Sequence, residues 1–173
     1  VHGLPIERVA AVGAFTPDAA QFVVPKGERA PAIVERFPFH LFFDRKLFEL
    51  LILESAQAGL SWITILRKRE GYRRAFAGFV PSKVARFGKQ DVSKLIKDSN
   101  IIRNKLKIES AINNAKRFLE VQKEFGSFSK YMWSFVGGKP IDGKRKSERD
   151  LPETTKESEA FARDLKQRGF KFL

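Results

Sequence analysis

The segment from Leu47 to Leu53 is almost wholly apolar, which predicts a helix that is buried on all sides. Glu54 follows this run directly, and Gly59 is a favourable residue for the end of the helix. Trp62 comes just after the turn, so the acid and the indole are expected to face one concave space. A buried carboxylate is either paired or retained for chemistry. Two interpretations stay open: a functional pocket, or a core helix with a salt-bridged Glu54 and a core Trp62.

Apolar residues recur at helical spacing over most of the remaining chain. Asp44 is the expected N-cap of the Glu54 helix, and Asp91 the expected N-cap of a later one. The other predicted helices cover Thr64 to Phe79, a short piece at 81–87, 101–125 ending at Gly126, 128–136, and Thr155 or Ser158 to Arg168 with a C-cap at Gly169. Because no strand pattern stands out, the fold class predicted is all-α.

A turn interrupts the helical pattern at 98–100, where Asp, Ser and Asn follow one another. The chain is expected to re-enter helix at Ile101, with Arg103, Lys105 and Lys107 just beyond the turn. A helix N-terminus offers free backbone N–H groups and a positive dipole end, which beside basic side chains suits phosphate. The alternative is an ordinary helical hairpin with a solvated basic end.

Composition favours the phosphate interpretation. The 173 residues carry a formal net charge of +13, which predicts a polyanionic partner, with nucleic acid ahead of an anionic membrane surface.

The chain has no cysteine, which excludes disulfides, thiolate metal sites and thiol catalysis. No apolar run approaches the ~18 residues of a membrane span. Residues 1–43 are broken by Pro and Gly and are expected to be largely irregular, whereas 44–173 form one helical domain.

Four segments carry a more specific pattern. They are LFELLILESAQAGLSWITILRKREGYRRAF at 47–76, DSNIIRNKLKIESAINNAKRFLEVQKEFGSF at 98–128, YMWSFVGGKP at 131–140 and LKQRGFKF at 165–172. In order and spacing they resemble the DNA-3-methyladenine glycosylase I family. The L-E-x-x-Q-A-G-L-S-W signature at 53–62 is the most specific of these matches.

The resemblance implies a helix-hairpin-helix glycosylase fold and excision of 3-methyladenine from alkylated double-stranded DNA. It implies that Glu54 is the catalytic and base-binding carboxylate and that Trp62 stacks on the base. Phe37 is expected where the family has a second pocket Trp. The hairpin that grips the DNA backbone would comprise Asn100, Ile101, Arg103, Asn104 and Lys105. The superfamily's catalytic Asp has no clear counterpart, so catalysis is expected to rest on base selection and on stabilising a cationic sugar.

The chain departs from the family pattern at the metal site and at one pocket residue. The family binds a structural zinc through Cys and His, but this chain has no Cys, and His2 and His40 do not sit in the family pattern. We therefore expect no metal and no other cofactor. The pocket tyrosine of the family is also missing. Any excision is then expected to be weak and confined to cationic N3-alkylated adenine.

Two functions follow from these observations. The first is a base-excision DNA glycosylase, and the alternative is a catalytically impaired DNA-binding paralogue that keeps the hairpin. A generic basic RNA- or membrane-binding module would leave Glu54 unexplained. We expect a monomer with no membrane partner, located inside the cell and associated with DNA, in a bacterial cytoplasm or in a nucleus or organelle.

Overall fold

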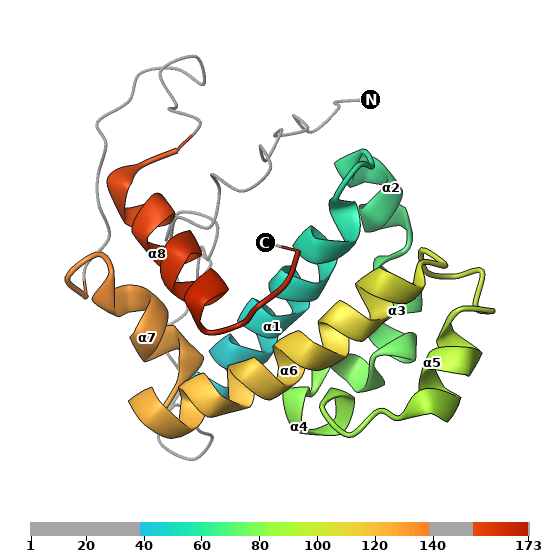
Figure 1. The fold of residues 1–173 in the computed structure, drawn as a ribbon, viewed down its shortest axis with the longest axis horizontal. Coiled ribbons are helices and arrows are strands. Elements are labelled where there is room, and N and C mark those ends of the chain that lie inside the picture. The colour runs from blue at the N-terminus through green and yellow to red at the C-terminus, as the bar shows by residue number, and fades with distance from the viewer. Residues whose placement is uncertain (1–38, 139–153, 173) are drawn as a thin grey trace, which may run out of the picture.

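The computed structural model describes residues 39–138 and 154–172, with side chains described from Asp44 onward, and every regular element in these ranges is a helix (Figure 1). In chain order the elements are α1 (Phe39–Gln57), α2 (Trp62–Arg67), α3 (Arg69–Ala75), the 3₁₀ helix η3 (Ala77–Phe79), α4 (Pro81–Val84), α5 (Lys89–Leu95), α6 (Lys105–Phe125), α7 (Phe128–Ser134) and α8 (Lys156–Gln167). The all-α prediction is confirmed. His2 and Phe37, for which the sequence made predictions, lie outside the described residues.

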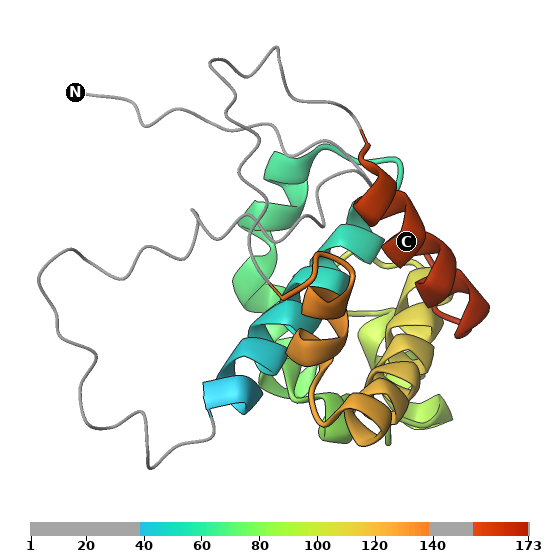
Figure 2. The ribbon, with the colours of Figure 1, turned by 90° about the vertical axis from the view of Figure 1, so that its left-hand side faces the viewer.

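The two longest helices, α1 and α6, form the centre of the fold. They pack on each other and on α7, while α4 and α5 pack along α6 (Figures 1 and 2). The ring of Phe118 in α6 stacks on Phe128 in α7 with 4.1 Å between centroids, and Phe48 in α1 meets Phe118 edge-on at 5.2 Å. All three rings are fully buried. This aromatic cluster holds α1 in a defined position, and α1 carries Glu54.

The polar contacts of α8 attach the end of the described chain to α6 and α7. The Tyr131 hydroxyl donates to Asp164 at 2.5 Å, and Arg168 Nε donates to the same carboxylate at 2.6 Å. The buried Asn114 carboxamide both donates to and accepts from the backbone of Lys171, each at 2.8 Å. The residues after α8 are thereby fixed along α6.

Several helix ends lie where the sequence pattern predicted them. Gly126 ends α6 with a φ of 82°, a conformation that glycine adopts without steric cost. Thr155 caps α8 by accepting a hydrogen bond from the Ser158 N–H at 3.2 Å, and Gly169 follows α8 with a φ of 84°. Local residue chemistry is sufficient at these positions because the capping groups are close in sequence.

The prediction that Asp44 is an N-cap was wrong, because α1 begins at Phe39. Asp44 is only 1% exposed, and its carboxylate accepts hydrogen bonds from the Phe128 and Ser129 N–H groups at 2.7 and 2.8 Å. The Gln122 amide donates a third bond at 2.7 Å. Asp44 therefore caps α7, a helix more than eighty residues away in sequence.

Further boundaries differ from the predictions, among them the ends of α4 at Val84 and α7 at Ser134, which were predicted at 87 and 136. The predicted helix from Thr64 to Phe79 is broken at Lys68 and again at Phe76, which gives α2, α3 and η3. Asp91 is the third residue of α5 and not its N-cap, and its carboxylate accepts the Gly88 N–H at 2.9 Å. Finally, α6 begins at Lys105 and not at 101, because 101–104 are not helical.

The break at Lys68 accompanies a buried charge cluster that the sequence analysis did not identify. Glu49 in α1 is 5% exposed and pairs with Arg69 Nε at 2.6 Å, Lys46 Nζ at 3.3 Å and Arg73 Nη2 at 3.4 Å. Burial opposes ionisation of Glu49, but the hydrogen bond and charge of Arg69 outweigh it and hold its pKa below the ordinary value. The cluster fixes α3 against α1.

We expect Glu49→Gln to lower the free energy of unfolding at neutral pH by about 1–3 kcal/mol, because a charge-assisted hydrogen bond is lost. A folded-state pKa below the unfolded value near 4.5 contributes stability above pH 4.5, and this contribution is lost as the pH falls through the folded pKa. Urea unfolding at pH 7 and pH 3 should therefore show a smaller pH effect in the variant. Glu120→Gln, which removes an exposed pair with Arg117, should change little. An unaltered pH dependence in Glu49→Gln would contradict the assignment.

Candidate functional site

Glu54 lies in the last turn of α1 and is partly buried. Within the described residues its carboxylate makes no hydrogen bond and no ion pair, so the salt-bridged interpretation finds no partner there. Burial raises the pKa of Glu54 above its ordinary value because the charged form is poorly solvated. This combination contrasts with Glu49, which is more deeply buried but has three cations around it. Among the described residues the hydrogen-bonding capacity of the Glu54 carboxyl group is therefore unused.

Trp62 is the first residue of α2 and packs, partly buried, against the hydrophobic core. The turn between the two helices is short: the Leu60 N–H donates to the Gln57 carbonyl at 2.6 Å, and Gly59 has a φ of 77°. The predicted helix end at Gly59 is thus close to the observed one. The indole consequently follows the acid by one tight turn, as the sequence suggested, and the concave pocket between them stays a prediction.

The hairpin turn before α6 has its own local hydrogen bonds. The Asp98 carboxylate accepts the backbone N–H and the side-chain amide of Asn100 at 2.8 and 2.9 Å, and Asn104 caps α6 by accepting the Lys107 N–H at 3.2 Å. Four of the five residues expected to contact DNA are exposed, namely Asn100, Arg103, Asn104 and Lys105. The fifth, Ile101, is 2% exposed and packs in the core, so only its backbone can face a ligand.

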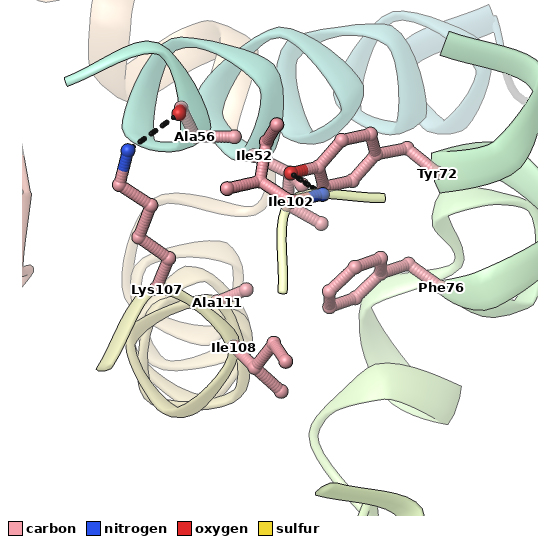
Figure 3. Close-up of a pocket in the computed structure, with 8 residues that line it drawn as sticks. All are labelled: Ile52, Ala56, Tyr72, Phe76, Ile102, Lys107, Ile108 and Ala111. Carbon is pink, nitrogen blue, oxygen red and sulfur yellow. Dashed lines mark hydrogen bonds between the residues drawn. The ribbon is translucent and has the colours of Figure 1, made fainter. Parts of the chain in front are cut away.

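The same turn is docked tightly on α3. Gly71 allows the close approach, because a Cβ at this position would lie 2.2 Å from the Asn100 carbonyl oxygen. The Tyr72 hydroxyl accepts the Ile102 N–H at 3.2 Å, as Figure 3 shows, and Lys68 Nζ donates to a backbone carbonyl of the turn at 2.6 Å. These contacts join residues about thirty positions apart, and no local pattern pointed to the role of Gly71.

Lys107 does not stand with Arg103 and Lys105 as a free cation, contrary to the sequence-based expectation. Its ammonium donates to the Ala56 carbonyl at 2.8 Å and to the Ala58 carbonyl at 2.6 Å, both at the end of α1. Figure 3 shows the side chain crossing from α6 to α1. The exposed basic tip of the hairpin therefore consists of Arg103 and Lys105.

The residues present do not fit the zinc site that the family resemblance implies. The chain has no Cys, and no group of three or more His, Cys, Asp or Glu side chains converges in the part of the chain that the structure describes. The side chains of His2 and His40 lie outside that part. The absence of a metal stays a prediction.

Among the described helices, none is long and apolar enough to cross a membrane.

Comparisons with known proteins agree with the all-helical fold. A family model described as methyladenine glycosylase matches residues 39–173. DNA-3-methyladenine glycosylase 1 of Escherichia coli is 43% identical over 130 residues, which cover 75% of this chain and 70% of that protein. DNA-3-methyladenine glycosylase of Haemophilus influenzae is 44% identical over 132 residues, covering 76% and 71%. The structure of 3-methyladenine DNA glycosylase I from Staphylococcus aureus superposes with a TM-score of 0.72 at 44% identity, covering 75% and 69%.

Proposed function

Because the chain belongs to the methyladenine glycosylase family, we propose that it is a DNA-3-methyladenine glycosylase acting on alkylated double-stranded DNA. The observation that carries the proposal is the Glu54 carboxylate, partly buried yet without a cation or hydrogen-bond donor among the described residues, one turn before Trp62. The family match spans both residues. A ligand that supplies a positive charge, a donor and a flat ring complements this pair.

The alkylated base has these properties. A 3-methyladenine in DNA is cationic, its exocyclic amine is a donor, and its glycosidic bond is already weak. The base must leave the helical stack before an enzyme can reach it. Glu54 then accepts from the amine, and the indole of Trp62 stacks on the electron-poor ring in a cation–π contact. The positive base also lowers the pKa of Glu54, which opposes the effect of burial and favours the carboxylate in the complex.

Hydrolysis needs little from the protein beyond this recognition. The bond between the base nitrogen and the sugar carbon breaks, the electron pair stays with the base, and 3-methyladenine leaves as a neutral molecule. Water adds to the cationic sugar and loses a proton to solvent, which leaves an abasic site. The protein holds the leaving base and stabilises the positive charge while it moves to the sugar. No strong nucleophile is required at a bond this labile.

Base release tests the proposal directly. The chain is incubated with duplex DNA treated with a methylating agent, and the released bases are separated by chromatography. Release of 3-methyladenine is expected, whereas duplexes that contain uracil or 8-oxoguanine should stay intact, because neither base is cationic. The catalytically impaired paralogue would bind DNA and release nothing. Efficient excision of a neutral base would show that the pocket has been assigned wrongly.

The exposed hairpin tip is proposed to bind the phosphate backbone. The first N–H groups of α6 have no acceptor within the helix, and Arg103 and Lys105 flank them on the surface. Such contacts orient the protein on DNA without reading its sequence.

We expect Arg103→Ala combined with Lys105→Ala to weaken duplex binding equally on unrelated sequences. Each lost phosphate contact should flatten the slope of log K against log salt concentration by about 0.9, so the pair should change it by about 1.8. Fluorescence anisotropy at several salt concentrations measures this slope. Lys116→Ala, on the exposed side of α6, is the control for a lost charge. An unchanged slope, or a loss confined to one sequence, would oppose the proposal.

A further inference from the structure

We propose that Lys107 is a positioning residue that couples the DNA-binding hairpin to the end of α1, and thereby holds Glu54 and Trp62 in the arrangement that excision requires. The inference rests on the function proposed above. It assigns a task to a basic residue that lies beside the phosphate-binding tip of the hairpin but is turned away from it.

The first support is the geometry of the Lys107 ammonium. Lys107 is the third residue of α6 and lies two residues after Lys105 of the hairpin tip. Its two hydrogen bonds, to the carbonyls of Ala56 and Ala58, occupy acceptors that a helix C-terminus leaves without intrahelical donors. The positive charge also lies at the negative end of the α1 dipole. The ammonium is partly removed from water here, and this burial lowers the pKa of Lys107.

The second support is the position of the two carbonyls along the chain. Glu54 lies two residues before Ala56, and Trp62 lies four residues after Ala58. The Lys107 ammonium therefore holds the backbone between the two residues that are proposed to bind the base. A shift of this segment would change the distance and angle between the carboxylate and the indole.

The third support is the sparse packing around this segment. A Cβ at Gly59 would meet no atom within 4 Å, so side chains do not hold the turn there. Beside Lys107 a small pocket separates α1, α3 and α6 (Figure 3). Its other lining residues are apolar or aromatic: Ile52, Ala56, Tyr72, Phe76, Ile102, Ile108 and Ala111. Within the described residues, the two hydrogen bonds of Lys107 are the only ones that join α6 to this end of α1.

Two roles for Lys107 make opposite predictions. A phosphate ligand contributes to DNA affinity and to its salt dependence, whereas a positioning residue contributes to the rate after DNA is bound. Lys107→Met keeps the length and apolar stem of the side chain but removes the donors and the charge. Lys107→Arg retains donors and charge, and Lys116→Met removes a charge from an exposed site on the same helix.

We expect Lys107→Met to keep the salt slope of duplex binding and to lower the single-turnover rate of 3-methyladenine release at saturating DNA by ten- to a hundredfold, as for a small misplacement of reacting groups. Binding of free 3-methyladenine, followed by quenching of tryptophan fluorescence, should weaken in parallel. Lys107→Arg should restore most of both, and Lys116→Met should match the unsubstituted chain. Thermal unfolding checks that each variant is folded.

The proposal is overturned if Lys107→Met flattens the salt slope by about 0.9 with an unchanged rate, which is the signature of a phosphate ligand. An unchanged rate together with unchanged base binding also overturns it. If Lys107→Met does not fold, Lys107→Gln, which keeps one donor, is expected to show an intermediate rate, and an unchanged rate counts against the proposal. If the unsubstituted chain releases no 3-methyladenine, the proposed function fails, and the coupling is judged from base binding alone.

Discussion

Replacing Glu54 with Gln should lower the rate of 3-methyladenine release by roughly ten- to a hundredfold. A glutamine carbonyl can still accept a hydrogen bond from the exocyclic amine, but the negative charge opposite the cationic base is lost. The attraction between unit charges about 4 Å apart is about 1 kcal/mol in water and about 4 kcal/mol near a protein surface, and its loss spans this range of rates. Single-turnover release from methylated duplex, measured at saturating DNA, reports the effect without interference from DNA affinity.

The same variant should be at least as stable as the unsubstituted chain. Burial raises the folded-state pKa of Glu54 above 4.5, so ionised Glu54 opposes folding at every pH above the unfolded value. Neutral Gln removes that cost, and urea unfolding at pH 7 measures the gain. Glu120→Gln, an exposed change on α6, is the matched control for both measurements. If Glu54→Gln were strongly destabilised and as active as the unsubstituted chain per folded molecule, Glu54 would be a structural residue and not the base-binding acid.

Replacing Asp44 with Ala should lower the free energy of unfolding by about 3–5 kcal/mol, the largest stability change expected for a single residue here. The substitution leaves the Phe128 and Ser129 N–H groups at the start of α7 without an acceptor in a buried site. It also frees the Gln122 amide. Chemical unfolding followed by circular dichroism measures the loss.

Two further variants show whether the capping bonds cause this loss. Asp44→Asn keeps one carbonyl acceptor and should fall between Ala and Asp. Asp91→Ala removes a cap that lies within its own helix and is better solvated, so it should cost only about 1 kcal/mol. If Asp44→Ala lowered the free energy of unfolding by less than Asp91→Ala does, α7 would not depend on a cap from α1.

The chain contains one part of the family pattern, the proposed base-binding residues, and lacks another, the cysteines of the zinc site. Glu54 and Trp62 lie in the segment that the family model matches, and the 173 residues contain no Cys. The aromatic cluster of α1, α6 and α7 and the contacts of α8 hold these helices together. Recognition of a cationic base is therefore proposed to rest on residues whose positions these helix contacts define.

The helical class, the helix ends at Gly126 and Thr155, and the succession of acid, turn and indole could all be predicted from the sequence. Each depends on residues that lie within a few positions of one another, so periodicity, capping chemistry and a short signature are sufficient. The family could be identified for a related reason, because the signature at 53–62 is contiguous. Sequence patterns therefore predict the structural features that depend on residues close together in the chain.

The roles of the charged side chains depend on contacts that form only in the folded protein. Asp44 looked like the cap of its own helix but caps α7, and Lys107 looked like a phosphate ligand but binds the end of α1. Glu49 lies in an apolar run, and the sequence did not predict its ion pair with Arg69, which accompanies the helix break at Lys68. A charged or polar group takes whichever partner folding brings near it, and these partners are 20 to 85 residues away in the chain. Burial and pairing follow from three-dimensional packing, and sequence spacing does not encode them.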